Sequence, residues 1–265
     1  MFLTYKDHIG LKKVSTLIDT KKNAERKILN AIKYYRYKDI GSDLLNKLRD
    51  HFLKNDKITY PEYIYHENWY ENGYKSFMDF FTRKLTNKKY NELSDNAQKC
   101  KMIIPNESWI EGLGNFKDTK KIVRLKKDSP EVLSELKKVG INIPTYNYID
   151  MKLLVTYYRR IHMPVTGIIK DMIPIEGVDD FFGNNSLWIL EIETKKSPVY
   201  LLLVGESTIQ DFDFLVEKKD KLNIFDTIGY FNWGSQTLIF YNPNDYNDLQ
   251  IEEKTKVFVG DCIFK

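Results

Sequence analysis

The sequence predicts an α+β fold, with helices in the first part of the chain and a β-rich second half. Two observations support this prediction. Apolar residues near the start recur at the three- and four-residue spacing of an amphipathic helix. After about Tyr157, short apolar runs rich in β-branched and aromatic residues follow one another. The 265 residues suffice for one good-sized domain with a helical appendage. We place a helical segment at residues 1–60 and the main domain at residues 61–265.

Four helices are expected before residue 141. The first covers residues 21–35, where the apolar side chains share one face. Ser42 can cap a second helix, and a third, short helix begins at Ser76. Ser129 is followed by a proline and an acid, which is typical of a helix start, and Gly140 is a natural stop for that fourth helix.

Strands are expected in the second half of the chain. The stretches concerned are apolar and rich in residues that favour strands, and polar turn residues separate them. They cover residues 186–194, 198–205, 229–233, 236–241 and 256–264.

The chain is mildly basic, with a net charge of +4 and a pI near 8.7. This charge is too diffuse for a nucleic-acid partner, and we expect most lysines to solvate the surface. A weak encounter with an anionic membrane surface is compatible with it. The first ten residues lack the apolar core of a signal peptide, and no apolar run is long enough to cross a bilayer. We therefore expect a cytoplasmic protein with at most a peripheral membrane contact.

The cysteines and histidines make no pattern of metal-ligand spacing. Cys100 and Cys262 are far apart in the sequence and lack a C-x-x-C arrangement. We expect both to be buried free thiols in a reducing compartment, and a disulfide between them is the alternative. The four histidines form no cluster, so no metal site is expected.

Five short stretches contain the residues whose side chains could take part in a reaction, and a sixth stretch lies near the C-terminus. They are residues 74–85 (YKSFMDFFTRKL), 104–108 (IPNES), 158–167 (YRRIHMPVTG), 203–206 (LVGE), 229–236 (GYFNWGSQ) and 256–261 (KVFVGD). In this order they resemble elements of the phosphatidylserine decarboxylase family. The five family elements are F-x-x-F-F-x-R-x-L, P-A-D-G or P-A-D-S, Y-H-R-x-H-x-P-V-x-G, V-G-A and G-x-F-x-x-G-S-T. The resemblance covers roughly residues 60–265.

The resemblance implies that the chain makes its own cofactor. In the family, a serine hydroxyl attacks the preceding carbonyl, and the resulting ester eliminates to leave a pyruvoyl group at a new N-terminus. Here the reacting bond would be Gly234–Ser235, and glycine leaves its carbonyl open because it has no Cβ. The serine needs a base. His162 is the candidate, and Glu107 would orient and charge-stabilise the imidazole.

The implied activity is that of a carboxy-lyase that converts phosphatidylserine to phosphatidylethanolamine and carbon dioxide. The covalent pyruvoyl group derived from Ser235 would form a Schiff base with a substrate amine and withdraw electrons as the carboxylate leaves. No metal is implied. The implied fold is a β-rich half-barrel or sandwich around the processing site, with the N-terminal helices near the lipid surface. A homodimer is a further expectation from the resemblance.

Five positions depart from the family, and one of them is Gln210, which stands about where a glycine is usual. Glu107 stands in place of aspartate, and Arg159 in place of the first histidine of Y-H-R-x-H. Glu206 follows Gly205 in place of a small alanine, and Gln236 replaces threonine. Arginine cannot release a proton near neutral pH, so Arg159 can only stabilise charge. Arg159, Gly205 and Glu206 are accordingly the candidate residues of the substrate pocket.

These departures leave three hypotheses open. The first is a pyruvoyl-dependent decarboxylase of phosphatidylserine or a related amino acid. The second is a divergent pyruvoyl enzyme that acts on another amine-bearing acid. The third is a non-catalytic homologue that serves as a binding or regulatory protein. A serine hydrolase is not expected, because no serine lies in a G-x-S-x-G stretch.

Overall fold

The computed structural model describes residues 82–118, 134, 136–153, 157–175, 187–205, 212–232 and 236–265. These residues are mostly β-structure, which confirms the β-rich half of the α+β prediction. The helices expected at residues 21–35, after Ser42 and at Ser76 lie outside the described residues. The proposed segment of residues 1–60 lies outside them as well.

The elements have the following bounds. They are α6 (Asn87–Ala97), β1 (Met102–Ile103), β2 (Ser108–Asn115), η1 (Phe116–Asp118), β3 (Asn147–Lys152), β4 (Arg160–His162), β5 (Gly167–Ile175), β6 (Leu187–Glu193), β7 (Val199–Val204), β8 (Phe212–Phe214), β9 (Lys221–Leu222), β10 (Thr227–Phe231), β11 (Gln236–Tyr241), η2 (Pro243–Asp245), β12 (Lys256–Val257) and β13 (Cys262–Phe264).

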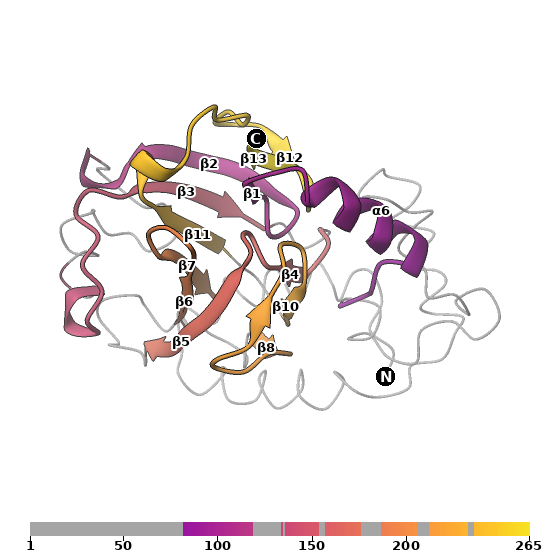
Figure 1. Ribbon diagram of the computed structural model, residues 1–265, viewed down its shortest axis with the longest axis horizontal. Helices are drawn as coiled ribbons and strands as arrows, with labels where there is room; N and C mark the ends of the chain where they lie inside the picture. Colours follow the sequence, from indigo (N-terminus) through magenta and orange to yellow (C-terminus); the bar gives the residue numbers. More distant parts are fainter. Residues whose placement is uncertain are drawn as a thin grey trace, which may run out of the picture.

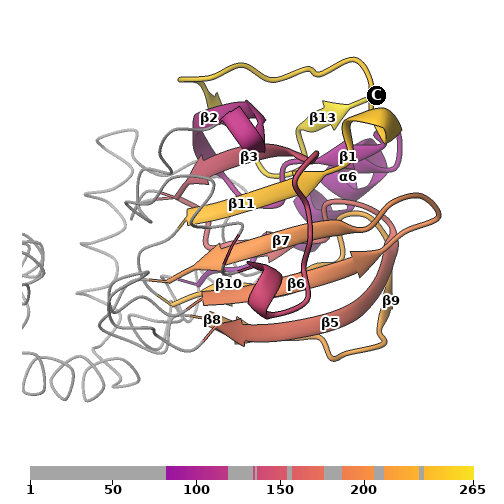
Figure 2. The same ribbon diagram turned by 90° about the vertical axis from the view of Figure 1, so that its left-hand side faces the viewer.

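The largest sheet has eight antiparallel strands in the order β12-β2-β3-β11-β7-β6-β5-β9. β11 lies in its interior, with Leu238 opposite Asp150 of β3 on one side and Leu202 of β7 on the other. All the residues of β11 are buried, because the strand has neighbours at both edges and packed side chains on both faces. Figures 1 and 2 show β3, β11, β7, β6 and β5 as successive strands.

A three-stranded sheet in the order β4-β10-β8 packs against the large sheet. Gly229 of β10 explains one motif position. A Cβ at Gly229 would overlap the carbonyl oxygen of Asp213 on β8, so the close approach of the two strands requires glycine. A third, two-stranded sheet joins β1 to β13.

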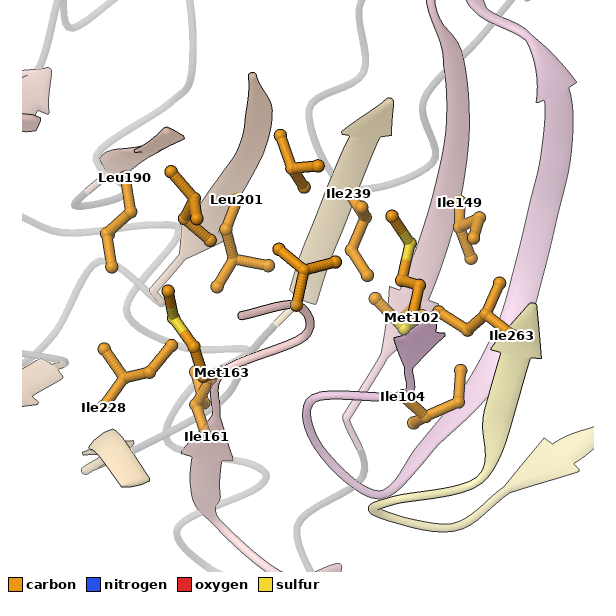
Figure 3. Close-up of a cluster of buried hydrophobic side chains, with 14 of the residues drawn as sticks. Met102, Ile104, Ile149, Ile161, Met163, Leu190, Leu201, Ile228, Ile239 and Ile263 are labelled. Atoms are coloured by element: carbon orange, nitrogen blue, oxygen red, sulfur yellow. The ribbon is translucent and has the colours of Figure 1, made fainter. Parts of the chain in front are cut away.

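The main hydrophobic core lies between the two larger sheets. Leu201 and Ile239 of the large sheet meet Ile161 and Ile228 of the small one. Figure 3 shows these side chains converging from both sides, with residues of β1 and β13 among them. Each fully buried aliphatic side chain of this kind stabilises the fold by roughly 1.5–3 kcal/mol.

A second core covers the opposite face of the large sheet. Leu238 and Phe240 of β11 pack there with Leu136 and Ile141. Residues 134 and 136–138 are helical, and Gly140 ends this helix with a positive φ of 82°. The Ile141 N–H donates to the Leu136 carbonyl oxygen (2.9 Å), as in a Schellman turn. The predicted stop at Gly140 is therefore confirmed, whereas the predicted start at Ser129 lies outside the described residues.

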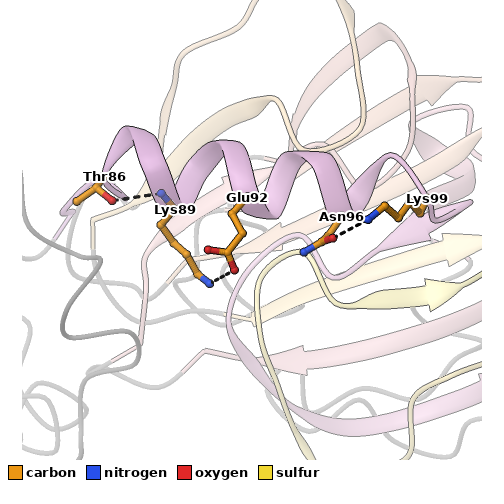
Figure 4. Close-up of polar contacts among 5 residues, drawn as sticks. All are labelled: Thr86, Lys89, Glu92, Asn96 and Lys99. Atoms are coloured by element: carbon orange, nitrogen blue, oxygen red, sulfur yellow. Dashed lines mark hydrogen bonds and ion pairs between the residues drawn. The ribbon is translucent and has the colours of Figure 1, made fainter.

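Helix α6 was not expected from the sequence. Thr86 caps its start by accepting a hydrogen bond from the Lys89 N–H (3.3 Å). Lys89 pairs with Glu92 (2.7 Å), and Asn96 accepts from the Lys99 ammonium group (3.0 Å), as Figure 4 shows. The helix packs through Tyr90, Leu93 and Ala97 against the cluster that contains Tyr158 and Phe225.

The strand predictions were mostly confirmed. β6, β7, β10 and β11 occupy nearly the expected ranges. The stretch 256–264 is divided into β12 and β13, since Gly260 turns the chain with a φ of 87°. The expectation that β-structure begins after about Tyr157 is wrong, because β2 and β3 precede that point.

The expectation of two free thiols is also wrong. Cys100 and Cys262 form a disulfide, with their Cα atoms 5.6 Å apart. The physical reason is the antiparallel pairing of β1 with β13, which places Ile103 opposite Cys262. This pairing brings Cys100, three residues before Ile103, close to Cys262. A separation of 162 residues in the sequence gave no sign of this neighbourhood.

Two properties concern only the described part of the chain. No helix there combines the length and the apolar composition needed to cross a membrane. No group of three histidine, cysteine or acidic side chains comes together there to hold a metal ion.

Candidate functional site

His162 lies at the end of β4, where three segments far apart in the sequence meet. It pairs in register with Thr227 of β10. Its backbone N–H donates to the carbonyl oxygen of Pro105 (2.8 Å). The stretches IPNES and YRRIHMPVTG and strand β10, which contains the start of the GYFNWGSQ stretch, are thus brought together around one fully buried histidine.

Both ring nitrogens of His162 have hydrogen-bond partners. Nδ1 lies 2.7 Å from the carbonyl oxygen of Phe225, and Nε2 lies 3.1 Å from the phenol oxygen of Tyr158. A carbonyl oxygen can only accept, so Nδ1 carries the hydrogen and Nε2 keeps its lone pair in the neutral ring. The Tyr158 phenol then donates to Nε2. These contacts fix both the tautomer and the plane of the imidazole.

The surroundings keep the imidazole neutral and the phenol protonated. Burial, together with the positive charge of Arg160, lowers the pKa of His162 to about 4, against the opposing effect of the Phe225 carbonyl. Burial raises the pKa of Tyr158 well above its usual value. At neutral pH the site therefore contains an uncharged base and an uncharged hydrogen-bond donor.

Phe225 has an unusual backbone conformation beside this base. Its φ is 77°, in the left-handed region that a bulky residue rarely adopts. Its ring is fully buried and stacks on the imidazole of His162, with 4.3 Å between centroids and 16° between planes. Strained residues of this kind persist where the surroundings impose them, and they cluster at functional sites.

Glu107 is fully buried in the same region and contacts Tyr158 from the other side. One carboxylate oxygen accepts a hydrogen bond from the Tyr158 N–H (2.8 Å), and the other lies 2.9 Å from the Lys256 ammonium group. Lys256 is partly exposed and lies over the ring of Tyr157 (4.6 Å to the centroid). The negative charge of Glu107 is thereby compensated without access to bulk water.

The direct contact expected between Glu107 and His162 does not occur among the described residues. Both ring nitrogens of His162 are bonded elsewhere, and Tyr158 lies between the two side chains. Glu107 holds the backbone of Tyr158, and Tyr158 in turn holds the imidazole. The Glu107 carboxylate therefore influences the position of His162 only through Tyr158.

The two arginines of YRRIH have different positions. Arg159 is fully buried, and its carbonyl oxygen accepts a hydrogen bond from the N–H of Phe231, the last residue of β10 (3.0 Å). Arg160 donates from Nε to the carbonyl oxygen of Thr82 (3.0 Å), and its guanidinium lies over the Tyr230 ring. Arg159 therefore lies beside the end of the strand that leads to Gly234.

Gly234 and Ser235 lie outside the described residues, but both flanks of this stretch are described. Asn232 and Gln236 are each 1% exposed. The Asn232 amide donates to the carboxylate of Asp213 (2.7 Å), and the Gln236 amide donates to the buried carboxylate of Asp150. Side-chain hydrogen bonds hold the chain on either side of the predicted processing bond.

Of the two other candidate residues of the substrate pocket, Gly205 lies among the described residues and Glu206 does not. Gly205 is buried and directly follows Val204, the register partner of Gln236. It therefore lies just after the end of β7, which is the neighbour of β11, the strand that begins directly after Ser235. Glu206 lies outside the described residues.

Sequence reasoning missed several residues of this site. Tyr158 was inside a quoted stretch, and its position four residues before His162 was the one available signal. Lys256 was inside the last quoted stretch, but nothing there pointed to Glu107. Phe225 and Asp150 gave no signal, because only the fold places them there. Their roles depend on backbone conformation and on strand pairing between distant segments.

Comparison of the sequence with known proteins finds a matching protein family. The model of the family described as phosphatidylserine decarboxylase matches residues 77–265, which is well over half of the chain. The domain boundary expected at residue 60 precedes this match and stays a prediction.

Curated relatives agree with this match. A phosphatidylserine decarboxylase proenzyme 2 from Komagataella phaffii is 26% identical over 199 residues, covering 64% of this chain and 18% of the relative. A proenzyme from Dickeya dadantii is 26% identical over 157 residues, covering 52% and 49%. A proenzyme from Shewanella sp. strain ANA-3 is 27% identical over 177 residues, covering 61% and 58%. The matched part thus spans between about a fifth and three fifths of these relatives.

Proposed function

The chain belongs to the phosphatidylserine decarboxylase family, and we propose that it is a pyruvoyl-dependent carboxy-lyase formed by cleavage of its own Gly234–Ser235 bond. The observation that carries this proposal is the fully buried, neutral His162, whose Nε2 keeps its lone pair. A serine hydroxyl needs such a base to become a nucleophile. The half-barrel fold of the family is part of the same proposal, and the eight-stranded sheet supports it.

In the proposed cleavage, Ser235 Oγ attacks the carbonyl carbon of Gly234 while its proton moves to Nε2 of His162. Tyr158, which bonds to Nε2, can relay this proton because a phenol both donates and accepts. The peptide C–N bond then breaks, and His162 returns the proton to the released amine, which leaves an ester. Loss of the Cα proton of residue 235 expels the Gly234 carboxylate, and addition of water releases ammonia.

The residues around the cleavage bond fit a fixed, buried cofactor. The hydrogen bonds of Asn232 and Gln236 anchor the chain on either side of it. The cofactor would therefore be carried at the start of β11, inside the largest sheet. When bound, the pyruvoyl ketone supplies the electron-withdrawing carbonyl that stabilises the charge left by a departing carboxylate.

Phosphatidylserine is the proposed substrate because the relatives bear that name. Another amine-bearing acid is the second candidate, because Arg159, in place of the histidine of the family element, would reshape the substrate pocket. This side chain is fully buried, it can bind an anionic group, and it cannot transfer a proton near neutral pH. Carbon dioxide release from phosphatidylserine vesicles, compared with release from free amino acids, distinguishes the two substrates.

Denaturing electrophoresis after complete reduction of the protein tests the cleavage. The wild type should give a long chain ending at Gly234 and a short chain of residues 235–265. Ser235→Ala should give one uncut chain. Ser197→Ala, in the turn between β6 and β7, is the matched control and should be cut like the wild type. An uncut wild type, or a cut Ser235→Ala variant, would refute the proposal.

A further inference from the structure

The disulfide between Cys100 and Cys262 joins two distant parts of the chain. Cys100 lies between α6 and β1, and Cys262 is the first residue of β13. The neighbouring backbones are hydrogen-bonded, since the Lys101 N–H donates to the Phe264 carbonyl oxygen (2.8 Å). The Cα separation of 5.6 Å lies within the range that a disulfide requires.

The proposed cleavage bond lies between these two cysteines in the sequence. Cys100 is upstream of Gly234 and Cys262 is downstream of Ser235. We infer that the processed protein consists of two chains joined by the Cys100–Cys262 disulfide. This inference rests on the proposed self-cleavage and adds a covalent link that the cleavage itself does not provide.

Strand pairing would hold the two chains together before any denaturation. The short chain contains β11, β12 and β13. β11 pairs with β3 and β7, β12 pairs with β2, and β13 pairs with β1, all of which belong to the long chain. The disulfide is therefore not needed for contact in the folded state, and its effect appears when the fold opens.

The covalent link keeps the short chain, and with it the cofactor, beside the long chain during unfolding. Without the link, reassembly is a bimolecular step that depends on protein concentration. With the link, the two chains remain at a high effective concentration, which for a short tether reaches the millimolar range. Refolding of the processed protein should then be independent of concentration.

The link can be opened and closed chemically. Both cysteines are partly exposed, so a small dithiol can reach the sulfur atoms. Reduction transfers two electrons and two protons from the dithiol to the disulfide, and the dithiol becomes a disulfide itself. Oxidised glutathione reverses the change by accepting two electrons from the two thiols.

The test is denaturing electrophoresis of the wild type after free thiols have been blocked, with and without dithiothreitol. We expect one full-size band without the reductant and two bands with it. Cys262→Ser should give two bands under both conditions. Release of the short chain from the wild type without reductant overturns the inference. One band under both conditions overturns the cleavage and, with it, the two-chain link.

A second measurement examines the disulfide independently of the cleavage. Ser235→Ala remains one chain if the proposed function is correct. Peptide mapping of this variant without reduction should find the peptides of Cys100 and Cys262 joined. Separate, blocked thiols at both positions after treatment with oxidised glutathione would overturn the inference even where the wild type is cut.

Discussion

The ring of Phe225 stacks on the imidazole of His162, and the carbonyl oxygen of the same Phe225 accepts the hydrogen bond from Nδ1 (2.7 Å). One residue thus fixes the ring plane and the tautomer of the proposed base together. Both interactions come from a residue whose backbone has a φ of 77°, and in this conformation its carbonyl and its ring contact the same neighbour. The strained conformation therefore has a local consequence for the proposed chemistry.

Replacement of Phe225 by leucine should expose His162 to more water. We expect its pKa to rise from about 4 towards the ordinary value near 6.5, because burial is the main cause of the lowering. The free energy of unfolding should fall by about 1–3 kcal/mol. NMR titration of the histidines and urea unfolding measure these two effects.

Phe116→Leu is the matched control for this prediction. Phe116 is also fully buried, but it packs in the second core, away from His162. It should lose a similar amount of stability while the pKa of His162 stays near 4. An unchanged His162 pKa in Phe225→Leu would contradict the role assigned to Phe225.

The stability of the protein should fall as the pH is lowered from about 6.5 to about 4. In this window the unfolded histidine binds a proton and the folded His162 does not, so protonation favours the unfolded state. One such group contributes a slope of at most about 1.4 kcal/mol per pH unit. Chemical unfolding of the wild type and of His162→Gln at several pH values measures the difference. If the unfolding free energies of the two proteins changed with pH in the same way, His162 would not be buried as a neutral ring.

Removal of the Tyr158 hydroxyl should slow the self-cleavage. Tyr158→Phe keeps the ring and its backbone bond to Glu107, but it leaves Nε2 of His162 without the phenol. If the phenol relays the serine proton, its loss should cost at least about 10²-fold in rate. The appearance of the short chain over time measures this rate. Tyr146→Phe, at a partly buried tyrosine in the second core, is the control and should process normally.

Loss of the Lys256 charge should cost more than loss of a similar exposed lysine. Lys256 and Lys152 are equally exposed, at 35% of the side chain, but their partners differ: Glu107 is fully buried and Glu111 is 23% exposed. Lys256→Met should lower the free energy of unfolding by about 1–3 kcal/mol, since it leaves a buried carboxylate with less compensation. Lys152→Met should cost less than about 1 kcal/mol. Equal losses of unfolding free energy in urea would show that the burial of Glu107 does not strengthen its ion pair with Lys256.

Much of the β-structure could be predicted from the sequence. β6, β7 and β11 are short, mainly apolar runs between polar turns, and burial on both faces explains why polar residues are few in them. β2 and β5 were missed because glycine, lysine and acidic residues interrupt them where one face is partly exposed. α6 was missed because its sequence is mostly polar, and packing through three side chains is what holds it to the fold.

The site could be predicted only where a residue type implies a reaction. His162 was predicted to be the base and Glu107 the carboxylate that orients it, and both are buried in one region. The order of contacts between them was not predictable, because the backbone N–H of Tyr158 takes the place expected for the imidazole. The disulfide was not predictable either, since it follows from the pairing of the first described strand with the last.

The intact mass of the reduced, denatured short chain tests the central claim most directly. Residues 235–265 are 31 of the 265, so this chain should carry about 3.7 kDa of the 31.5 kDa total. If the N-terminus is a pyruvoyl group, the mass should be one ammonia lower than that of the same peptide starting with serine. Borohydride should then add two hydrogens. A short chain with an unmodified serine, or a wild type that stays uncut, would contradict the account.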